Sequence, residues 1–379
     1  MTALLNLEAY RRLAQRRLPR IVFDYIEGGA DDESGIRRNR EALDALLLDP
    51  ARLTDVSARD LSATLAGARS AAPLVVAPMG LNGACRPDGD VMLARAAARA
   101  GIPFTLSTAS NVALAEVARR AGGRLWFQLY VVQREHARAL VKGALSAGYE
   151  ALVLTTDVTV NGRRERDLRN GFAVPLRLTP RIVADAALHP AWTIRQCRHG
   201  LPTLPNVDGG VDGGADAGAQ AALLQRRMDA SFCWDDLAAL RDMWPRKLYV
   251  KGILNARDAA RCVALGADGV IVSNHGGRQL ADLAAPISVL PEVVAAVGGA
   301  QTLVDSGFRN GRDVVKALAL GARAVMLGRP LLYGLAARGE TGVDEVLAMF
   351  VADIDRTLAL LGCPDVVSLG QGRYIRNSL

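Results

Sequence analysis

The sequence predicts a (β/α)8 TIM barrel, and three observations support this fold class. Half of the 379 residues are apolar, 5% are aromatic and 37 are glycine, a composition that suits short strands and helices joined by tight turns. Short apolar runs alternate with helical patterns along the chain. Eight such runs occur, and eight strands that are apolar on both faces predict a closed parallel barrel. The alternative, an open doubly wound sheet, is weakened because no GxGxxG motif follows the first run.

The predicted strands are β-rich apolar runs that stop at breaks rich in Gly, Ser and Asp. They cover 74–78, 103–108, 126–131, 151–157, 247–253, 269–274, 301–307 and 324–329. The segments between them have apolar residues at helical spacing and therefore predict helices. The clearest of these cover 90–100, 111–121, 135–147, 256–265 and 312–320. We expect a single domain over 1–379, with a helical segment before the first strand and a long insertion after the fourth.

Charge and cysteine content disfavour several classes of protein. Lys and Arg (46) outnumber Asp and Glu (39), which suits acidic substrates, phosphates or anionic lipid. Nucleic acid is disfavoured because the basic residues are scattered and no zinc, RNP or basic-helix pattern occurs. The five cysteines form no CxxC pair, so neither a disulfide framework nor a metal site is predicted and a reducing cytoplasm is expected. Without a signal-peptide pattern or ~18 consecutive apolar residues, we expect a protein that is soluble or bound to a membrane surface.

The segment 273–280, which reads SNHGGRQL, directly follows an apolar run. Barrel enzymes carry their chemistry at the C-terminal ends of the strands. The imidazole of His275 can take a proton and the guanidinium of Arg278 can hold a carboxylate, which together predict chemistry on an organic acid. The alternative is a histidine satisfied in a turn, where Gly276 and Gly277 supply positive φ. Polar residues at nearly every other predicted strand end argue against that alternative.

The ends of the last two predicted strands indicate a phosphate site. Asp305, Gly307 and Arg309 lie at the end of the seventh strand, and Gly328 and Arg329 lie at the end of the eighth. Glycines let backbone N–H groups approach a phosphate closely, and arginines supply positive charge. The alternative is two ordinary glycine turns. The residues therefore predict a phosphate-bearing cofactor.

Four motifs resemble those of a known family. They are 23–30 (FDYIEGGA), 126–130 (WFQLY), 161–167 (NGRRERD) and 273–280 (SNHGGRQL). Over nearly its whole length the chain is similar to the FMN-dependent (S)-2-hydroxy acid dehydrogenases and oxidases, and most similar to their bacterial (S)-mandelate dehydrogenase members. The resemblance implies FMN as cofactor and oxidation of an (S)-2-hydroxy acid, with (S)-mandelate expected, to the 2-oxo acid.

The resemblance implies a role for each candidate catalytic and substrate-binding residue. His275 is the expected base, and Asp157 is expected to hold the resulting imidazolium and to raise the basicity of the ring. Arg164 and Arg278 are expected to clamp the substrate carboxylate. Two hydroxyl groups are expected to add hydrogen bonds, those of Tyr25 and Tyr130. Proton abstraction to a carbanion and hydride transfer both place His275 at the centre, and both stay open.

The resemblance also implies which residues bind the flavin. Lys251 is expected at the N1/C2 carbonyl edge, where a cation stabilises the anionic reduced ring. The other residues expected to bind FMN are Pro78, Met79, Gly80, Ser107, Gln128, Thr155, Ser273, Asp305, Gly307, Arg309, Gly328 and Arg329.

Three positions bear on which member of the family this is. Gly80 stands where oxidases of the family tend to have alanine, which favours a dehydrogenase with a separate acceptor such as quinone. Ala109 stands where glycolate oxidase-like members have tryptophan, so a larger pocket for an aromatic acid is expected. A small residue there also fits a simple difference in packing. Ala281 replaces the family's aspartate, which leaves the support behind Arg278 open.

The insertion, an inserted loop over 176–225, is expected to bind a membrane. Its part 177–201 is basic and amphipathic and contains Trp192, a pattern typical of helices on an anionic membrane surface. The alternative is a helix that covers the barrel mouth or a subunit contact. The following 207–218 is low in complexity and is expected to be disordered. The resemblance implies a homotetramer, peripheral on the inner face of the cell membrane.

The sequence leaves several alternative functions open. Within the family, the alternative is an L-lactate dehydrogenase or a 2-hydroxy acid oxidase. From other classes, the alternatives are a phosphate-binding barrel isomerase without flavin and a non-catalytic protein that binds a membrane surface.

Overall fold

The computed structural model describes residues 4–172, 179–200, 202–208, 228–371 and 374–377, and the predicted closed barrel is present. The barrel strands, in spatial order, are β4 (Leu74–Val76), β5 (Phe104–Ser107), β6 (Leu125–Leu129), β7 (Ala151–Thr155), β8 (Lys247–Ile253), β9 (Gly269–Val272), β10 (Gln301–Val304) and β11 (Ala324–Leu327). All pairs are parallel, and β11 closes the barrel against β4 with Leu327 opposite Val76. Most strands end one to three residues before the predicted ends, because those residues turn into the loops above the barrel.

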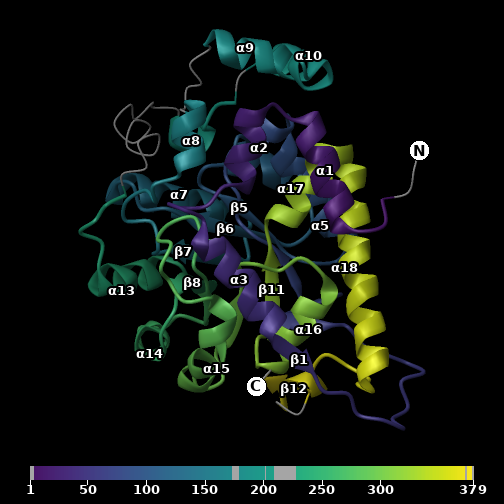
Figure 1. Ribbon diagram of the computed structural model, residues 1–379. Helices are drawn as coiled ribbons and strands as arrows, with labels where there is room; N and C mark the ends of the chain where they lie inside the picture. The colour runs from purple at the N-terminus through teal and green to yellow at the C-terminus, as the bar shows by residue number, and fades with distance from the viewer. Residues whose placement is uncertain (1–3, 173–178, 201, 209–227, 372–373, 378–379) are drawn as a thin grey trace.

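Helices connect the strands and surround the barrel (Figure 1). Those outside the insertion are α1 (Leu7–Arg17), α2 (Arg20–Glu27), α3 (Ser34–Ala45), α4 (Asn82–Cys85), α5 (Gly89–Arg99), α6 (Leu114–Ala121), α7 (Arg134–Ser146), α13 (Trp234–Met243), α14 (Ala256–Ala264), α15 (Pro286–Ala296), α16 (Gly311–Ala319), α17 (Arg329–Arg338) and α18 (Glu340–Leu361). The expected N-terminal helical segment is α1 to α3. Three of these helices begin at an asparagine cap, since the side chains of Asn6, Asn255 and Asn310 accept hydrogen bonds from Ala9 N, Asp258 N and Asp313 N.

The lower half of the barrel interior is filled by a closed apolar cluster. Trp126 and Tyr249 stack in it with ring centroids 5.1 Å apart, and Leu65 of the hairpin formed by β2 (Ala63–Leu65) and β3 (Ala68–Ser70) is buried in the same cluster. The hairpin therefore closes the N-terminal end of the barrel. Space for a ligand remains at the C-terminal ends of the strands, as the fold class requires.

A small two-stranded sheet lies near the C-terminus, at the bottom of Figure 1. There β1 (Leu46–Leu48) pairs antiparallel with β12 (Ile375–Asn377). Near it lies the short 3-10 helix η1 (Ser368–Gln371), which contacts α16.

The described part of the chain between β7 and α13 contains further short helices, of which α8 precedes the insertion. They are α8 (Glu165–Asn170), α9 (Pro180–Ala187), α10 (Pro190–His199) and α11 (Pro205–Asp208), and α9 and α10 lie at the upper edge of the molecule (Figure 1). Val183, Leu188 and Ile194 are exposed on α9 and α10 or between them, by 53%, 80% and 51%. In the part of the chain that the structure describes, no helix is long and apolar enough to cross a membrane.

The structure bears on two points about the insertion. Trp192 does not face outward with the exposed apolar residues, because its Nε1 donates to Ala84 O of the barrel body and the residue is buried. The segment expected to be disordered begins in ordered structure, since its first residue, Val207, lies in α11 and is fully buried. The rest of that segment, from 209 onward, lies outside the described residues.

Candidate active site

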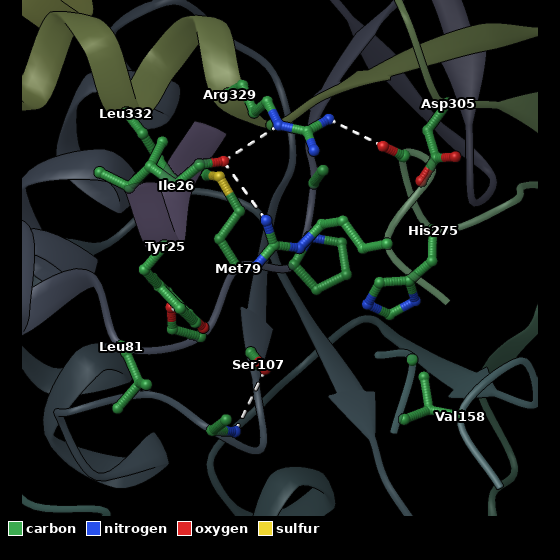
Figure 2. A pocket seen from close by; sticks show the side chains of 18 of the residues that line it. Tyr25, Ile26, Met79, Leu81, Ser107, Val158, His275, Asp305, Arg329 and Leu332 are labelled. Atoms are coloured by element: carbon green, nitrogen blue, oxygen red, sulfur yellow. Dashed lines mark hydrogen bonds between the residues drawn. The ribbon is translucent and has the colours of Figure 1, made fainter. Parts of the chain in front are cut away.

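A cavity of about 470 Å³ lies at the C-terminal ends of the barrel strands, within the range of small-molecule sites. It is lined by sixteen of the nineteen predicted site residues: Tyr25, Pro78, Met79, Gly80, Ser107, Tyr130, Thr155, Arg164, Lys251, His275, Arg278, Asp305, Gly307, Arg309, Gly328 and Arg329. The other three lie directly behind lining residues. Asp157, Ser273 and Gln128 bond to His275, Lys251 and Ser107 respectively. Figure 2 shows His275 and Asp305 on one side of this cavity and Tyr25 and Leu81 on the other.

His275 is held in an uncommon backbone conformation. Its φ is +58°, in the left-handed region that costs non-glycine residues energy and recurs at functional sites. Its N–H donates to Ser273 Oγ at 3.0 Å. The next N–H, of Gly276, donates to Ser306 Oγ at 2.9 Å. The turn therefore fixes the direction in which the imidazole points.

The two ring nitrogens of His275 have different partners. Its Nδ1 lies 2.9 Å from Oδ1 of Asp157, while Nε2 faces the hydroxyl of Tyr130 at 3.5 Å. Asp157 is backed by Gly252, where any side chain is excluded because a Cβ would lie 2.7 Å from the aspartate Cβ and φ is +104°. Nδ1–H donating to the carboxylate leaves Nε2 as the proton acceptor toward the cavity.

Burial and charge set the protonation states of this pair. The pKa of His275 is lowered from its ordinary value, chiefly by burial, with Lys251 and Arg164 adding to the lowering and Asp157 opposing it. The pKa of Asp157 is lowered although burial raises it, because His275 and Lys251 stabilise the carboxylate. Asp157 raises the pKa of His275, as expected, but burial outweighs this contribution and the net pKa is lowered. The imidazole is neutral and the carboxylate ionised at neutral pH, the states that a general base and its partner need.

Lys251 is a buried cation at the floor of the cavity. Its Nζ donates to Ser273 Oγ at 2.8 Å and lies 3.2 Å from Asp305 and 4.0 Å from Asp157. Burial lowers its pKa, but the two carboxylates outweigh burial and the net pKa is raised. The ammonium stays charged in a nearly water-free position, where it interacts strongly with any anionic group beside it.

Arg278 and Arg164 approach the cavity from neighbouring loops. Arg278 donates to Gly28 O at 2.7 Å and lies over the Tyr25 ring, 5.2 Å from its centroid. Arg164 is 7% exposed and donates to Arg278 O at 3.3 Å and to Gln279. The carbonyls after α2 and the tyrosine ring thus support Arg278 without a carboxylate at position 281. Both guanidiniums lie on the side of the cavity where they can hold a carboxylate.

Arg329, which was expected to hold a phosphate, is hydrogen-bonded to backbone carbonyl groups in the structure. Arg329 donates to the carbonyls of Ile26, Gly276 and Gly28 at 2.9–3.0 Å (Figure 2). Burial, then Arg278 and Arg309, lowers its pKa to about 10. A concentration of positive charge in a buried position attracts an anion, and Gly307 and Gly328 lie in the cavity lining beside it.

Two buried polar atoms without partners indicate where a flat polar cofactor fits. Within the described residues, Gln128 Nε2 and Thr155 Oγ1 are buried and make no hydrogen bond, although such groups are nearly always paired in folded proteins. Both lie near the carboxyl ends of barrel strands, and Thr155 is opposite Lys251 of the neighbouring strand. A ring system with polar edges, a chain and a phosphate fits these donors, the cation and the arginine-rich end, so the residues suit FMN.

Sequence reasoning missed the apolar side of the cavity. Tyr25 stacks on Phe172 with centroids 4.5 Å apart, and further apolar residues from the insertion and nearby loops line this side: Leu81, Val158, Leu204 and Met228. These residues lie in loops without apolar periodicity, so no sequence pattern marks them. Their signal is spatial, since segments far apart in the chain converge there.

Known proteins resemble this chain closely. The family described as FMN-dependent dehydrogenase matches residues 14–376. (S)-Mandelate dehydrogenase of Pseudomonas putida is 56% identical over 374 residues, which cover 99% of this chain and 94% of the relative. An L-lactate dehydrogenase of Caulobacter vibrioides is 43% identical over 365 residues, covering 96% and 95%. A crystal structure of a monotopic membrane protein, (S)-mandelate dehydrogenase, superposes with a TM-score of 0.94 at 55% identity, covering 99% of this chain and 100% of that chain.

Proposed function

The chain belongs to the FMN-dependent dehydrogenase family and oxidises (S)-2-hydroxy acids with FMN, and from this premise we propose that its substrate is (S)-mandelate. The observation that carries the proposal is the apolar side of the cavity, where Phe172, Leu204 and Met228 extend the lining beyond the polar groups. A phenyl ring fits such a wall, whereas the methyl group of lactate leaves much of it unfilled. The 56% identical relative has the same substrate in its name.

In the proposed binding mode, Arg164 and Arg278 hold the substrate carboxylate, and Tyr25 and Tyr130 bond its oxygens. This places the carbon that bears the hydroxyl group near Nε2 of His275. His275 takes a proton there, and the imidazolium is stabilised by Asp157 2.9 Å from its other nitrogen. FMN, when bound, would accept the two electrons and the second proton that the substrate loses.

We propose that the same cavity binds FMN through the remaining predicted residues. Lys251 lies against the polar edge of the ring, where its charge offsets negative charge gained on reduction. Pro78, Met79 and Gly80 present their backbone to the ring. The residues that bond the ring edge are Ser107, Gln128, Thr155 and Ser273, and those that hold the ribityl chain and phosphate are Asp305, Gly307, Arg309, Gly328 and Arg329.

Anaerobic titration of the flavin absorbance tests the substrate. We expect (S)-mandelate to bleach the oxidised flavin more efficiently than (S)-lactate. The ratio of the reduction rate constant to the dissociation constant should be about tenfold or more higher, because each methylene-sized contact of the phenyl ring contributes about 1–3 kcal/mol to discrimination. Turnover with and without oxygen separates a dehydrogenase from an oxidase. A preference for lactate would overturn the substrate, and a protein that does not take up FMN would overturn the whole proposal.

The pH dependence of flavin reduction is a second expected result. The base must be neutral, and the pKa of His275 is lowered, so the rate falls only as the pH drops below the ordinary imidazole value of about 6.5. We expect a plateau from about pH 7 upward and an acid limb displaced below that value. Stopped-flow reduction at a series of pH values measures it, as the reduction rate constant divided by the dissociation constant of (S)-mandelate, because this ratio reports the pKa of the free enzyme. A limb centred above pH 7 would contradict the assignment.

We propose that the enzyme is peripheral on the inner face of the cell membrane, is a homotetramer and passes electrons to quinone. The structurally similar relative is a monotopic membrane protein. In this chain Leu188 and Ile194 are exposed large apolar residues at the edge of the molecule. Such residues on a basic helical segment favour a membrane interface.

Polar substitution of these residues tests the membrane contact. We expect Leu188→Ser/Ile194→Ser to shift the protein from the membrane fraction to the soluble fraction with unchanged reduction by mandelate, because neither residue lines the cavity. Leu360→Ser, an exposed leucine at the C-terminal end of α18, is the matched control and should stay with the membrane. If the double variant sediments with membranes as the parent does, these residues are not the anchor.

A further inference from the structure

Three arginines from separate elements converge beside α10. Arg17 is in the last turn of α1, Arg86 ends α4, and Arg195 is on the inner side of α10. Arg195 experiences the positive charge of both others, which together with burial, the largest cause, lowers its pKa. We call these residues the arginine cluster. It lies outside the active-site cavity, whose lining contains none of the three.

The arginine cluster has no carboxylate partner among the described residues. Within the described residues none of its members forms an ion pair, whereas many other arginines do. Nearby acidic residues are already engaged, since Asp88 bonds Arg120 with both oxygens and Glu340 and Asp344 bond Arg99. Three like charges held together without an anion are unfavourable.

Helix α17 compensates only part of this charge. Arg17 donates to Ala337 O in the last turn of α17, and the Arg86 guanidinium lies against Gly339, where a Cβ would be 2.8 Å from its central carbon. The C-terminus of a helix carries about half a negative charge. The two arginines therefore have a structural reason to lie there, but a charge of more than two remains.

Arg195 has no such structural reason. Its Nε is buried and has no hydrogen-bond partner within the described residues, which is costly for a charged donor. The helix that carries it is docked by other residues, because Trp192 and Gln196 donate to Ala84 O and Gly83 O. An anion between the three guanidiniums would satisfy both the orphaned donor and the excess charge.

We propose that the arginine cluster binds the phosphate of an anionic phospholipid headgroup. The group must be a phosphate or similar oxyanion, because planar guanidiniums match its oxygens in pairs. We take lipid as the source because two large apolar residues of the same helical segment, Leu188 and Ile194, are exposed by 80% and 51% and can contact acyl chains. The inference rests on the proposed membrane contact and adds a specific headgroup site to it.

Calorimetric titration of the detergent-solubilised holoenzyme tests the site. The probe is a short-chain phosphatidylglycerol, with the matching phosphatidylcholine and free glycerol 1-phosphate as separate arms. We expect saturable one-site binding of the phosphatidylglycerol, weaker binding of the phosphatidylcholine and much weaker binding of glycerol 1-phosphate. Arg195→Gln and Arg86→Gln should each weaken it about tenfold or more, as charged hydrogen bonds do when lost.

Arg198→Gln is the matched control, because it removes one exposed positive charge from the same helix outside the arginine cluster. Binding by this variant should be unchanged, and reduction by mandelate should be unchanged in all three variants, which also shows that they fold. Equal losses in Arg198→Gln and Arg195→Gln, or no saturable binding, would overturn the proposal in favour of a diffuse charge effect. Equal affinity for glycerol 1-phosphate would overturn lipid as the source.

Sedimentation with vesicles of phosphatidylcholine and phosphatidylglycerol in equal parts distinguishes the headgroup site from the membrane contact. If the parent protein sediments with vesicles but shows no saturable lipid binding, the headgroup site is wrong and the membrane contact stands. If it binds the short-chain lipid but does not sediment, the membrane contact is wrong and the anion site stands.

Discussion

Replacing His275 with glutamine is expected to slow flavin reduction by (S)-mandelate roughly 10²- to 10⁴-fold, the usual contribution of a positioned base. The amide is polar and similar in size to the imidazole, but it has no nitrogen that accepts a proton at neutral pH. FMN content and substrate affinity should stay close to those of the parent, because other residues supply those contacts. Anaerobic stopped-flow absorbance measures the rate, and the dependence on substrate concentration gives the affinity.

Two further variants sharpen this result. His199→Gln makes the same change at an exposed position of α10 and should leave the rate unchanged. Asp157→Asn should cause a smaller loss than His275→Gln, because the base remains while the imidazolium loses the carboxylate beside it. Reduction of the His275→Gln enzyme at near the parent rate would remove His275 from the role of base.

The barrel was predictable because its signal is local and repeated. Each strand is an uninterrupted apolar run, and β8 (Lys247–Ile253) has the predicted bounds. The other strands are shorter than predicted, since residues such as Pro78 and Asp157 belong to the loops that form the site. The closure of the N-terminal end of the barrel by Leu65 was not predictable, because a three-residue strand is too short to show a periodic pattern.

The polar part of the site was predictable for a different reason. The C-terminal ends of parallel strands meet at one end of a barrel, so polar residues at those positions must gather. His275 and Lys251, 24 residues apart in the chain, both contact Asp157 for this reason. What the sequence could not give is the balance of opposing effects. Asp157 raises the basicity of His275, but the burial that outweighs it exists only once the chain is folded.

The apolar side of the site lies beyond sequence reasoning because it is built across the insertion. Leu204 packs with Leu81 and Val132 in one buried cluster, to which Phe172 and Met228 add from outside. Trp192 shows the same limit, since an amphipathic pattern cannot tell which face of a helix docks on the protein and which faces outward. Only the hydrogen bond to Ala84 O decides it.

Substituting Ala109 by tryptophan is expected to reverse the substrate preference. Ala109 borders the apolar side of the cavity and its position is fixed, because its carbonyl accepts from Leu81 N at 3.0 Å. An indole there occupies the space proposed for the phenyl ring. We expect kcat/KM for (S)-mandelate to fall about 10²-fold or more, while that for (S)-lactate changes by less than about tenfold.

The comparison of two substrates on one variant makes this prediction specific to the pocket. Damage to the FMN site or to His275 would lower both values together, since both acids use the same base and carboxylate contacts. Loss confined to mandelate can arise only where the two acids differ, at the side chain. Ala109→Ser, which keeps the volume of the residue nearly unchanged, should retain the preference for mandelate. A parallel loss for both acids in Ala109→Trp would place the aromatic ring elsewhere and remove the apolar side of the cavity from substrate selection.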